Sequence, residues 1–140
     1  MFTTKVEAII HAPIEKVFSY VRDLETMPQY NAHLKHAKWL DENKTSCAIT
    51  LSLSIVSINS DYKIVEMQDG IRLVAKCDSS ALAFEDIYEF ESRGENTFLR
   101  ITDHLELKGL LKLSEGFLSG IFGKEMQGNM DRLVKKIEAL

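Results

Sequence analysis

The chain has 140 residues, 45% of them hydrophobic and 27% charged, which is enough to build one domain with its own core. Its 21 acidic residues outnumber 17 basic ones, and the net charge of −4 disfavours nucleic-acid binding, which needs a basic face. No apolar run approaches the roughly 18 residues that span a bilayer, and the N-terminus does not resemble a secretory signal. We therefore expect one cytoplasmic domain over residues 1–140, without stable membrane insertion.

The first part of the chain predicts one strand followed by two short helices. Residues 2–11 predict a strand, and Pro13 suits the first turn of a helix. That helix is indicated by apolar residues three and four positions apart: Ile14, Val17, Phe18 and Val21. Residues 23–33 predict a second short helix or an irregular turn, interrupted before Pro28.

The middle of the chain predicts six strands, at residues 35–40, 45–56, 58–67, 71–77, 81–91 and 97–108. Residues 45–56 alternate between apolar and polar, which is typical of a strand with one wet face. Asp69-Gly70 is a hairpin signal, and residues 93–96 join the last two strands. Neighbouring strands joined by short turns indicate an antiparallel meander.

The tail from Ser114 to Leu140 predicts a long helix, with Ser114 as a plausible N-cap. Its apolar stripe consists of Leu118, Phe122, Met126, Met130, Leu133 and Ile137, widened by Phe117, Ile121 and Val134. A stripe this wide suits a helix that lies on a sheet. The predicted class is α+β, with a curved antiparallel sheet of about seven strands wrapped around the C-terminal helix. Such a sheet encloses a cavity unless large side chains fill it.

Four glycines interrupt this predicted helix, at Gly116, Gly120, Gly123 and Gly128. Each costs up to about 1 kcal/mol relative to alanine in a helix interior. They either leave room for a pocket or let the first half of the helix hinge. Alternatively, they permit close packing on the sheet, or the helix begins only after Gly123.

The most informative feature is a pair of acids on the last hairpin. Asp86 shares the more apolar face of residues 81–91 with Phe84 and Tyr88, and Asp103 lies among leucines on the next strand. If Arg93 pairs with Asn96, the acids are directly opposite, with Cβ atoms about 5 Å apart. If Glu91 pairs with Asn96, they are diagonal neighbours at roughly 7–8 Å. A bulge or a one-residue slip would instead turn an acid outward.

Two carboxyl groups held together in an apolar site share a proton, because burial and the neighbouring charge raise one pKa. Asp86 and Asp103 are therefore candidate catalytic residues, or they only bind a ligand's hydroxyl. Tyr62 and Tyr88 either fill the core or direct hydroxyls into a cavity, where these need partners. His33 and His36 give only a weak metal signal, so we expect loop or surface positions, with no metal and no cofactor.

Several local sequences carry a family resemblance: Ile10–Phe18, Asp23–Tyr30, and the last hairpin leading through Gly109 into the glycine-bearing helix. They resemble the Bet v 1-like superfamily of helix-grip proteins. The START-like polyketide cyclase/dehydrase and lipid-transport branch (SRPBCC) is the most similar part of it. The resemblance covers the whole chain and implies the helix-grip fold. It carries over no catalytic motif, and a fold alone does not define a reaction.

Three functional hypotheses remain open. The leading one is binding, with or without transport, of a small hydrophobic ligand such as a lipid, isoprenoid or polyketide-like molecule in the cavity. The residues expected to bind it are Phe84, Asp86, Tyr88, Asp103, Ile121, Phe122 and Met126. The second is a cyclase or dehydratase that uses Asp86 and Asp103. The third is a protein-interaction module, with a filled core and an exposed apolar patch.

Overall fold

The computed structural model describes residues 2–53 and 56–140. The chain begins with β1 (Phe2–Ile10), α1 (Ile14–Arg22) and the 3₁₀ helix η1 (Leu24–Gln29). Six strands follow: β2 (Leu34–Trp39), β3 (Ser46–Leu53), β4 (Val56–Gln68), β5 (Arg72–Asp78), β6 (Leu82–Arg93) and β7 (Asn96–Leu107). A second 3₁₀ helix, η2 (Gly109–Ser114), leads into α2 (Glu115–Glu138). The predicted order is confirmed, except that η2 was not expected and positions 54 and 55 of the strand predicted over 45–56 lie outside the described residues.

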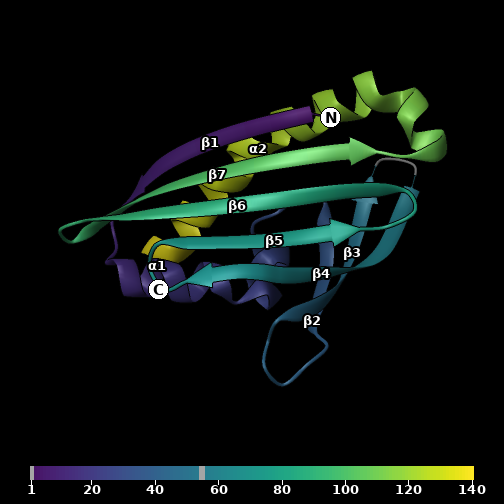
Figure 1. The fold of residues 1–140 in the computed structure, drawn as a ribbon. Coiled ribbons are helices and arrows are strands. Elements are labelled where there is room, and N and C mark those ends of the chain that lie inside the picture. Colours follow the sequence, from purple (N-terminus) through teal and green to yellow (C-terminus); the bar gives the residue numbers. More distant parts are fainter. Residues whose placement is uncertain (1, 54–55) are drawn as a thin grey trace.

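The seven strands form one antiparallel sheet in the order β1-β7-β6-β5-β4-β3-β2. Strands β2 to β7 are a meander, and β1 adds to the β7 edge. The register shifts between Leu34 and His36 in β2 and between Ile64 and Glu66 in β4. Such irregularities bend a strand and increase its twist, so they favour the curvature of the sheet. Figure 1 shows α1 and α2 on the same side of this sheet.

The short helices close one end of the core. Val17, Phe18 and Val21 turn inward from α1, and the Phe18 ring meets Phe90 of β6 edge-on, with centroids 5.0 Å apart. Asp23 then caps η1 by accepting a hydrogen bond from the backbone N–H of Glu25. The second short helix of the prediction is therefore confirmed as a 3₁₀ helix. It continues through Pro28, so the predicted interruption before that residue is wrong.

Helix α2 packs through Leu118, Met130, Leu133 and Ile137, which are all buried. The helix already begins at Glu115, so the alternative start after Gly123 is wrong. Ser114 occupies the N-cap position, but its side chain makes no capping hydrogen bond. Phe117 does not widen the buried stripe, because its side chain is 68% exposed. Leu118 takes the inward position in this turn, and one residue along a helix rotates the side chain by about 100°.

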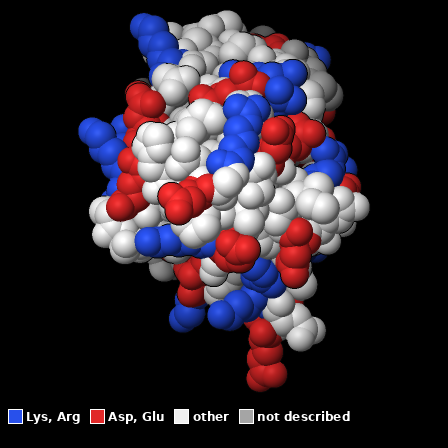
Figure 2. All heavy atoms as spheres, turned by 90° about the vertical axis from the view of Figure 1, so that its left-hand side faces the viewer, with Lys and Arg blue, Asp and Glu red and all other residues white. Residues whose placement is uncertain are grey.

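The outer surface carries interspersed charges. Figure 2 shows acidic and basic side chains mixed over one end of the molecule, with no continuous basic patch on that face. Pairs across neighbouring strands contribute to this mixture, such as Arg100 with Glu7 and Arg72 with Glu89. None of the described helices has the length and apolar composition needed to cross a membrane.

Candidate functional site

Strands β6 and β7 bring the two acids face to face. Arg93 pairs with Asn96 at the turn, and the register then places Asp86 directly opposite Asp103. This is the first of the two predicted registers, and the diagonal alternative is wrong. Both acids line the cavity under α2, so neither is turned to the opposite face of the sheet by a bulge. Arg100, on the same strand as Asp103, donates to Glu7 and not to either acid.

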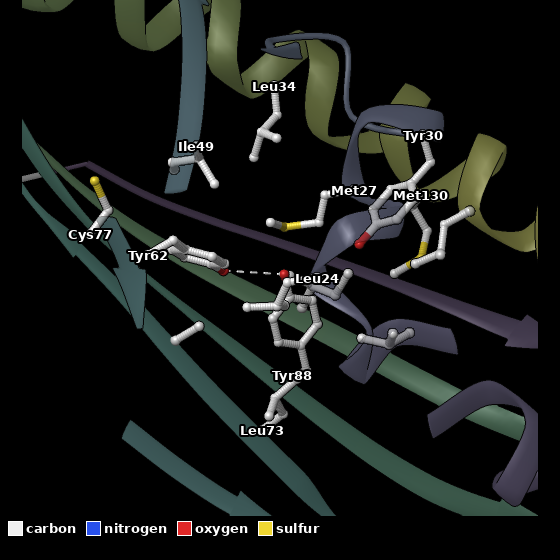
Figure 3. Packing of buried hydrophobic residues seen from close by; sticks show 14 of the residues in the cluster. Leu24, Met27, Tyr30, Leu34, Ile49, Tyr62, Leu73, Cys77, Tyr88 and Met130 are labelled. Carbon is white, nitrogen blue, oxygen red and sulfur yellow. Dashed lines mark hydrogen bonds between the residues drawn. The ribbon is translucent and has the colours of Figure 1, made fainter. Parts of the chain in front are cut away.

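Tyr62 supports the acid pair from the neighbouring part of the sheet. It lies on β4 between Cys47 of β3 and Cys77 of β5, and it is completely buried. Its hydroxyl donates to Asp86 Oδ2 at 2.5 Å and lies 3.4 Å from the hydroxyl of Tyr88. Figure 3 shows the Tyr62–Tyr88 contact as a dashed line. Because Tyr62 gives its only proton to Asp86, the proton for the contact with Tyr88 must come from Tyr88.

The two carboxyl groups share a proton. Burial raises the pKa of Asp103, and the negative charge of Asp86 and a hydrogen bond between the carboxyls raise it further. Burial also raises the pKa of Asp86, although hydrogen bonds from Asp103 and Tyr62 partly offset that effect. Asp103 is therefore the protonated member near neutral pH, and the Asp86 carboxylate accepts from both Asp103 and Tyr62.

A cavity of about 80 Å³ borders the pair. Its apolar wall includes Leu34, Leu51, Leu82 and Leu105 from the sheet, and Met126 and Met130 from α2. The polar atoms on its wall belong to the acids, to Tyr30 and Tyr88, and to Asn31, His33 and Asn129. This combination of apolar walls and a few convergent polar groups is typical of small-molecule sites.

The structure places six of the seven predicted ligand-binding residues on the cavity wall: Phe84, Asp86, Tyr88, Asp103, Phe122 and Met126. Ile121 does not line it. Its side chain is partly buried against the core, next to the wall residue Phe122. The apolar stripe predicted the buried side of α2, but it did not distinguish residues that face the cavity from those that pack beside it.

Sequence reasoning missed the segment between η1 and β2. Tyr30, Asn31 and His33 all line the cavity, and His33 meets the ring of Phe122 edge-on at 5.1 Å between centroids. His33 does lie in a loop, as expected, but its Nε2 atom is buried rather than at the surface. An irregular segment has no periodicity that indicates which side chains turn inward. Only the polar and aromatic composition of Tyr30-Asn31-Ala32-His33 offered a signal.

The glycines of α2 do not share one explanation. A Cβ atom at Gly116 or Gly120 would meet nothing within 4 Å, so close packing on the sheet does not account for these two. At Gly123 a Cβ would lie 3.4 Å from the ring of Phe2, which is ordinary contact. None of the four lines the cavity, so they do not provide its room directly. Within residues 2–53 and 56–140, no three metal-binding side chains gather into a metal site.

A curved sheet that holds a long helix over a partly polar cavity defines a helix-grip domain. Residues 1–138 match the family described as polyketide cyclase / dehydrase and lipid transport, and the chain belongs to that family. The resemblance to the polyketide cyclase/dehydrase and lipid-transport family predicted from the sequence is thereby confirmed. No curated protein matches the sequence.

Solved structures of low sequence identity share the fold. A START superfamily protein from Mycobacterium smegmatis has a TM-score of 0.82 at 14% identity, with 99% of each chain covered. The Zhui aromatase/cyclase from a Streptomyces species has a TM-score of 0.78 at 8% identity, covering 97% of this chain and 93% of its own. Ara h 8.0201 has a TM-score of 0.70 at 13% identity, covering 99% and 98% respectively.

The shared proton predicts how stability depends on pH. The pKa of aspartate in an unfolded chain is about 3.9, and that of Asp103 in the folded protein is higher. Between these two pKa values the folded state binds one proton more than the unfolded state. Wild-type stability should therefore fall as the pH rises through that window. The asparagine in Asp103→Asn cannot titrate. The free energy of unfolding of this variant, relative to that of the wild type, should therefore increase with pH by at most about 1.4 kcal/mol per pH unit. Urea unfolding at about pH 4, 6 and 8 measures this difference.

Asp78→Asn is the matched control for that experiment. A hydrogen bond from Lys108 lowers the pKa of Asp78, so its contribution to stability is present above the unfolded pKa and lost on acidification. That loss falls below about pH 4, so between pH 4 and 8 the difference between Asp78→Asn and the wild type should stay nearly constant. If the difference between Asp103→Asn and the wild type is the same at all three pH values, the two acids do not share a buried proton.

Two of the tyrosines near the acids, Tyr62 and Tyr30, should lose unequal amounts of stability when each is changed to phenylalanine. Tyr62→Phe removes a donor from the Asp86 carboxylate and should lower the free energy of unfolding by about 1.5–3 kcal/mol. Tyr30→Phe removes a buried hydroxyl that has no protein partner among the described residues, so it should be neutral or stabilising. Urea unfolding compares the two variants. Equal losses would contradict the hydrogen-bond assignment.

Proposed function

We propose that this chain binds a small, mainly apolar molecule of isoprenoid, lipid or polyketide-like character between the sheet and α2. The observation that carries the proposal is the cavity itself, whose leucine and methionine walls surround one proton-sharing acid pair. Apolar contacts supply most of the affinity in such sites, and the few polar groups orient the ligand. Membership of a family described by polyketide and lipid chemistry supports the same proposal.

The size of the cavity limits what it accepts without rearrangement. Its volume of about 80 Å³ is well below the roughly 300–1,000 Å³ of pockets for drug-sized ligands. Three methionines, Met27, Met126 and Met130, line it, and their unbranched side chains adapt readily to new shapes. A ligand larger than a few heavy atoms therefore requires these side chains, or α2 itself, to move.

Native mass spectrometry of the protein purified from its own host tests the proposal. We expect an apolar molecule to co-purify and to be released on denaturation. Leu105→Phe adds bulk inside the cavity and should lower ligand occupancy. Leu107→Phe is the matched control, because Leu107 is also buried on β7 but does not line the cavity. A wild-type protein that carries no ligand and binds no apolar probe would contradict the proposal.

A cyclase or dehydratase is the second candidate, favoured by the position of the acids on the cavity wall. The shared proton lies on Asp103 and Asp86 accepts its hydrogen bond, so one proton donor and one proton acceptor face the same space. Such a pair can protonate a leaving hydroxyl and accept a proton from the neighbouring carbon, which eliminates water. The interaction-module hypothesis is less favoured because it requires a filled core, although Leu110, Leu113 and Phe117 are exposed.

The co-purified molecules of the wild type and of Asp103→Asn separate binding from catalysis. An enzyme should carry product, whereas the Asn variant, which lacks the acidic proton, should retain substrate. For a dehydratase the retained molecule is heavier by one water, and for a cyclisation or isomerisation it has equal mass but a different chromatographic retention. The same molecule in the same amount in both proteins would eliminate the enzyme hypothesis.

A further inference from the structure

Two polar atoms on the cavity wall lack a hydrogen-bond partner within the described part of the chain. They are the hydroxyl of Tyr30 and the Nε2 atom of His33, and both are buried. Tyr30 as a whole is only 6% exposed, and both residues line the cavity. A buried donor without an acceptor costs the free energy of a lost hydrogen bond, so such atoms are rare unless something else satisfies them.

The segment that carries these two atoms is held in place by α2. Arg132 Nε donates to the backbone carbonyl of Tyr30 at 2.9 Å, and the backbone N–H of Ala32 donates to Asn129 Oδ1 at 3.0 Å. The backbone N–H of His33 donates to Asn31 Oδ1 at 3.0 Å. With its backbone fixed at these points, the segment presents Tyr30 and His33 to the cavity in a defined orientation.

Tyr30 is a persistent proton donor at this site. Figure 3 shows its hydroxyl directed toward the part of the core that also holds the hydroxyls of Tyr62 and Tyr88. Burial raises the pKa of Tyr30, and the nearby charge of Asp86 raises it further. The phenol therefore keeps its proton. The hydroxyls of Tyr62 and Tyr88 are within bonding distance of each other, but that of Tyr30 reaches neither.

The charges around the cavity restrict the ligand further. No lysine or arginine is among the described residues that line it, and the acid pair carries one negative charge when it shares one proton. A carboxylate or phosphate group placed there would lose its hydration without gaining a cation, and it would face Asp86. A neutral oxygen avoids that cost and accepts the proton that Tyr30 offers.

We propose that the ligand is an uncharged molecule that presents a carbonyl or hydroxyl oxygen to the Tyr30 hydroxyl, with His33 Nε2 contacting a second polar atom. This specifies the ligand class of the function proposed above and rests on that function. It excludes free fatty acids and phosphate-bearing lipids as cavity ligands. Tyr30 is then a specificity-determining residue, because no described protein group competes with the ligand oxygen for its proton.

Three probes of similar size test the inference: acetophenone, ethylbenzene and benzoate, titrated into the wild type and into Tyr30→Phe by calorimetry or NMR. Tyr30→Phe should weaken acetophenone binding about tenfold, because one hydrogen bond is lost. The affinity for ethylbenzene should change by less than about twofold, since it has no acceptor. Benzoate should not bind in the cavity of either protein at neutral pH. In the wild type, the ¹³C resonance of the Tyr30 Cζ atom should move with acetophenone and not with ethylbenzene.

Tyr20→Phe is the matched control, because the Tyr20 hydroxyl donates to Gln29 and does not line the cavity. It should leave the binding of all three probes unchanged. If Tyr30→Phe weakens acetophenone and ethylbenzene equally, or if benzoate binds as tightly as acetophenone, the inference is wrong while the proposed binding function stands. If neither neutral probe binds to the wild type, the proposed function fails and this inference fails with it.

Discussion

Asp86 and Asp103 lie directly opposite each other under α2, where two negative charges cannot coexist. The other polar contacts of the site follow from that constraint. Asp103 keeps a proton and donates a hydrogen bond to Asp86. Tyr62 on β4 donates a second hydrogen bond to Asp86. A pair built in this way needs donors and tolerates no further anion. The same constraint therefore connects the stability of the folded chain with the kind of molecule that the cavity accepts.

The acid pair could be predicted because it depends on two simple regularities. Side chains alternate along a strand, so the apolar neighbours of each acid indicate which face it shares. The turn at residues 93–96 then sets the register, and the tighter of the two alternatives is the one observed. The family resemblance predicted the same architecture from different residues, near the beginning of the chain, and the match over residues 1–138 confirms it.

The rest of the site could not be predicted, for physical reasons. Tyr30 and His33 lie in an irregular segment, whose inward side chains are set by hydrogen bonds with α2, 97 and 102 residues away in sequence. The apolar stripe of α2 identified its buried side, but not the width of that side, because Leu118 and not Phe117 turns inward in the first part of the helix. Phe117 is therefore exposed, and Ile121 packs beside the cavity rather than on its wall.

Strand β1 is made long before β7, its partner in the sheet, which pairs with it through residues 97–105. During synthesis, β1 stays unpaired until the ribosome has made almost the whole meander from β2 to β7. Its free backbone edge is able to bind other extended chains during that time. Helix α2, which covers β1, emerges later still. Segments made later therefore protect one made earlier, and a chain that stops short of β7 exposes the edge of β1 that β7 covers in this structure.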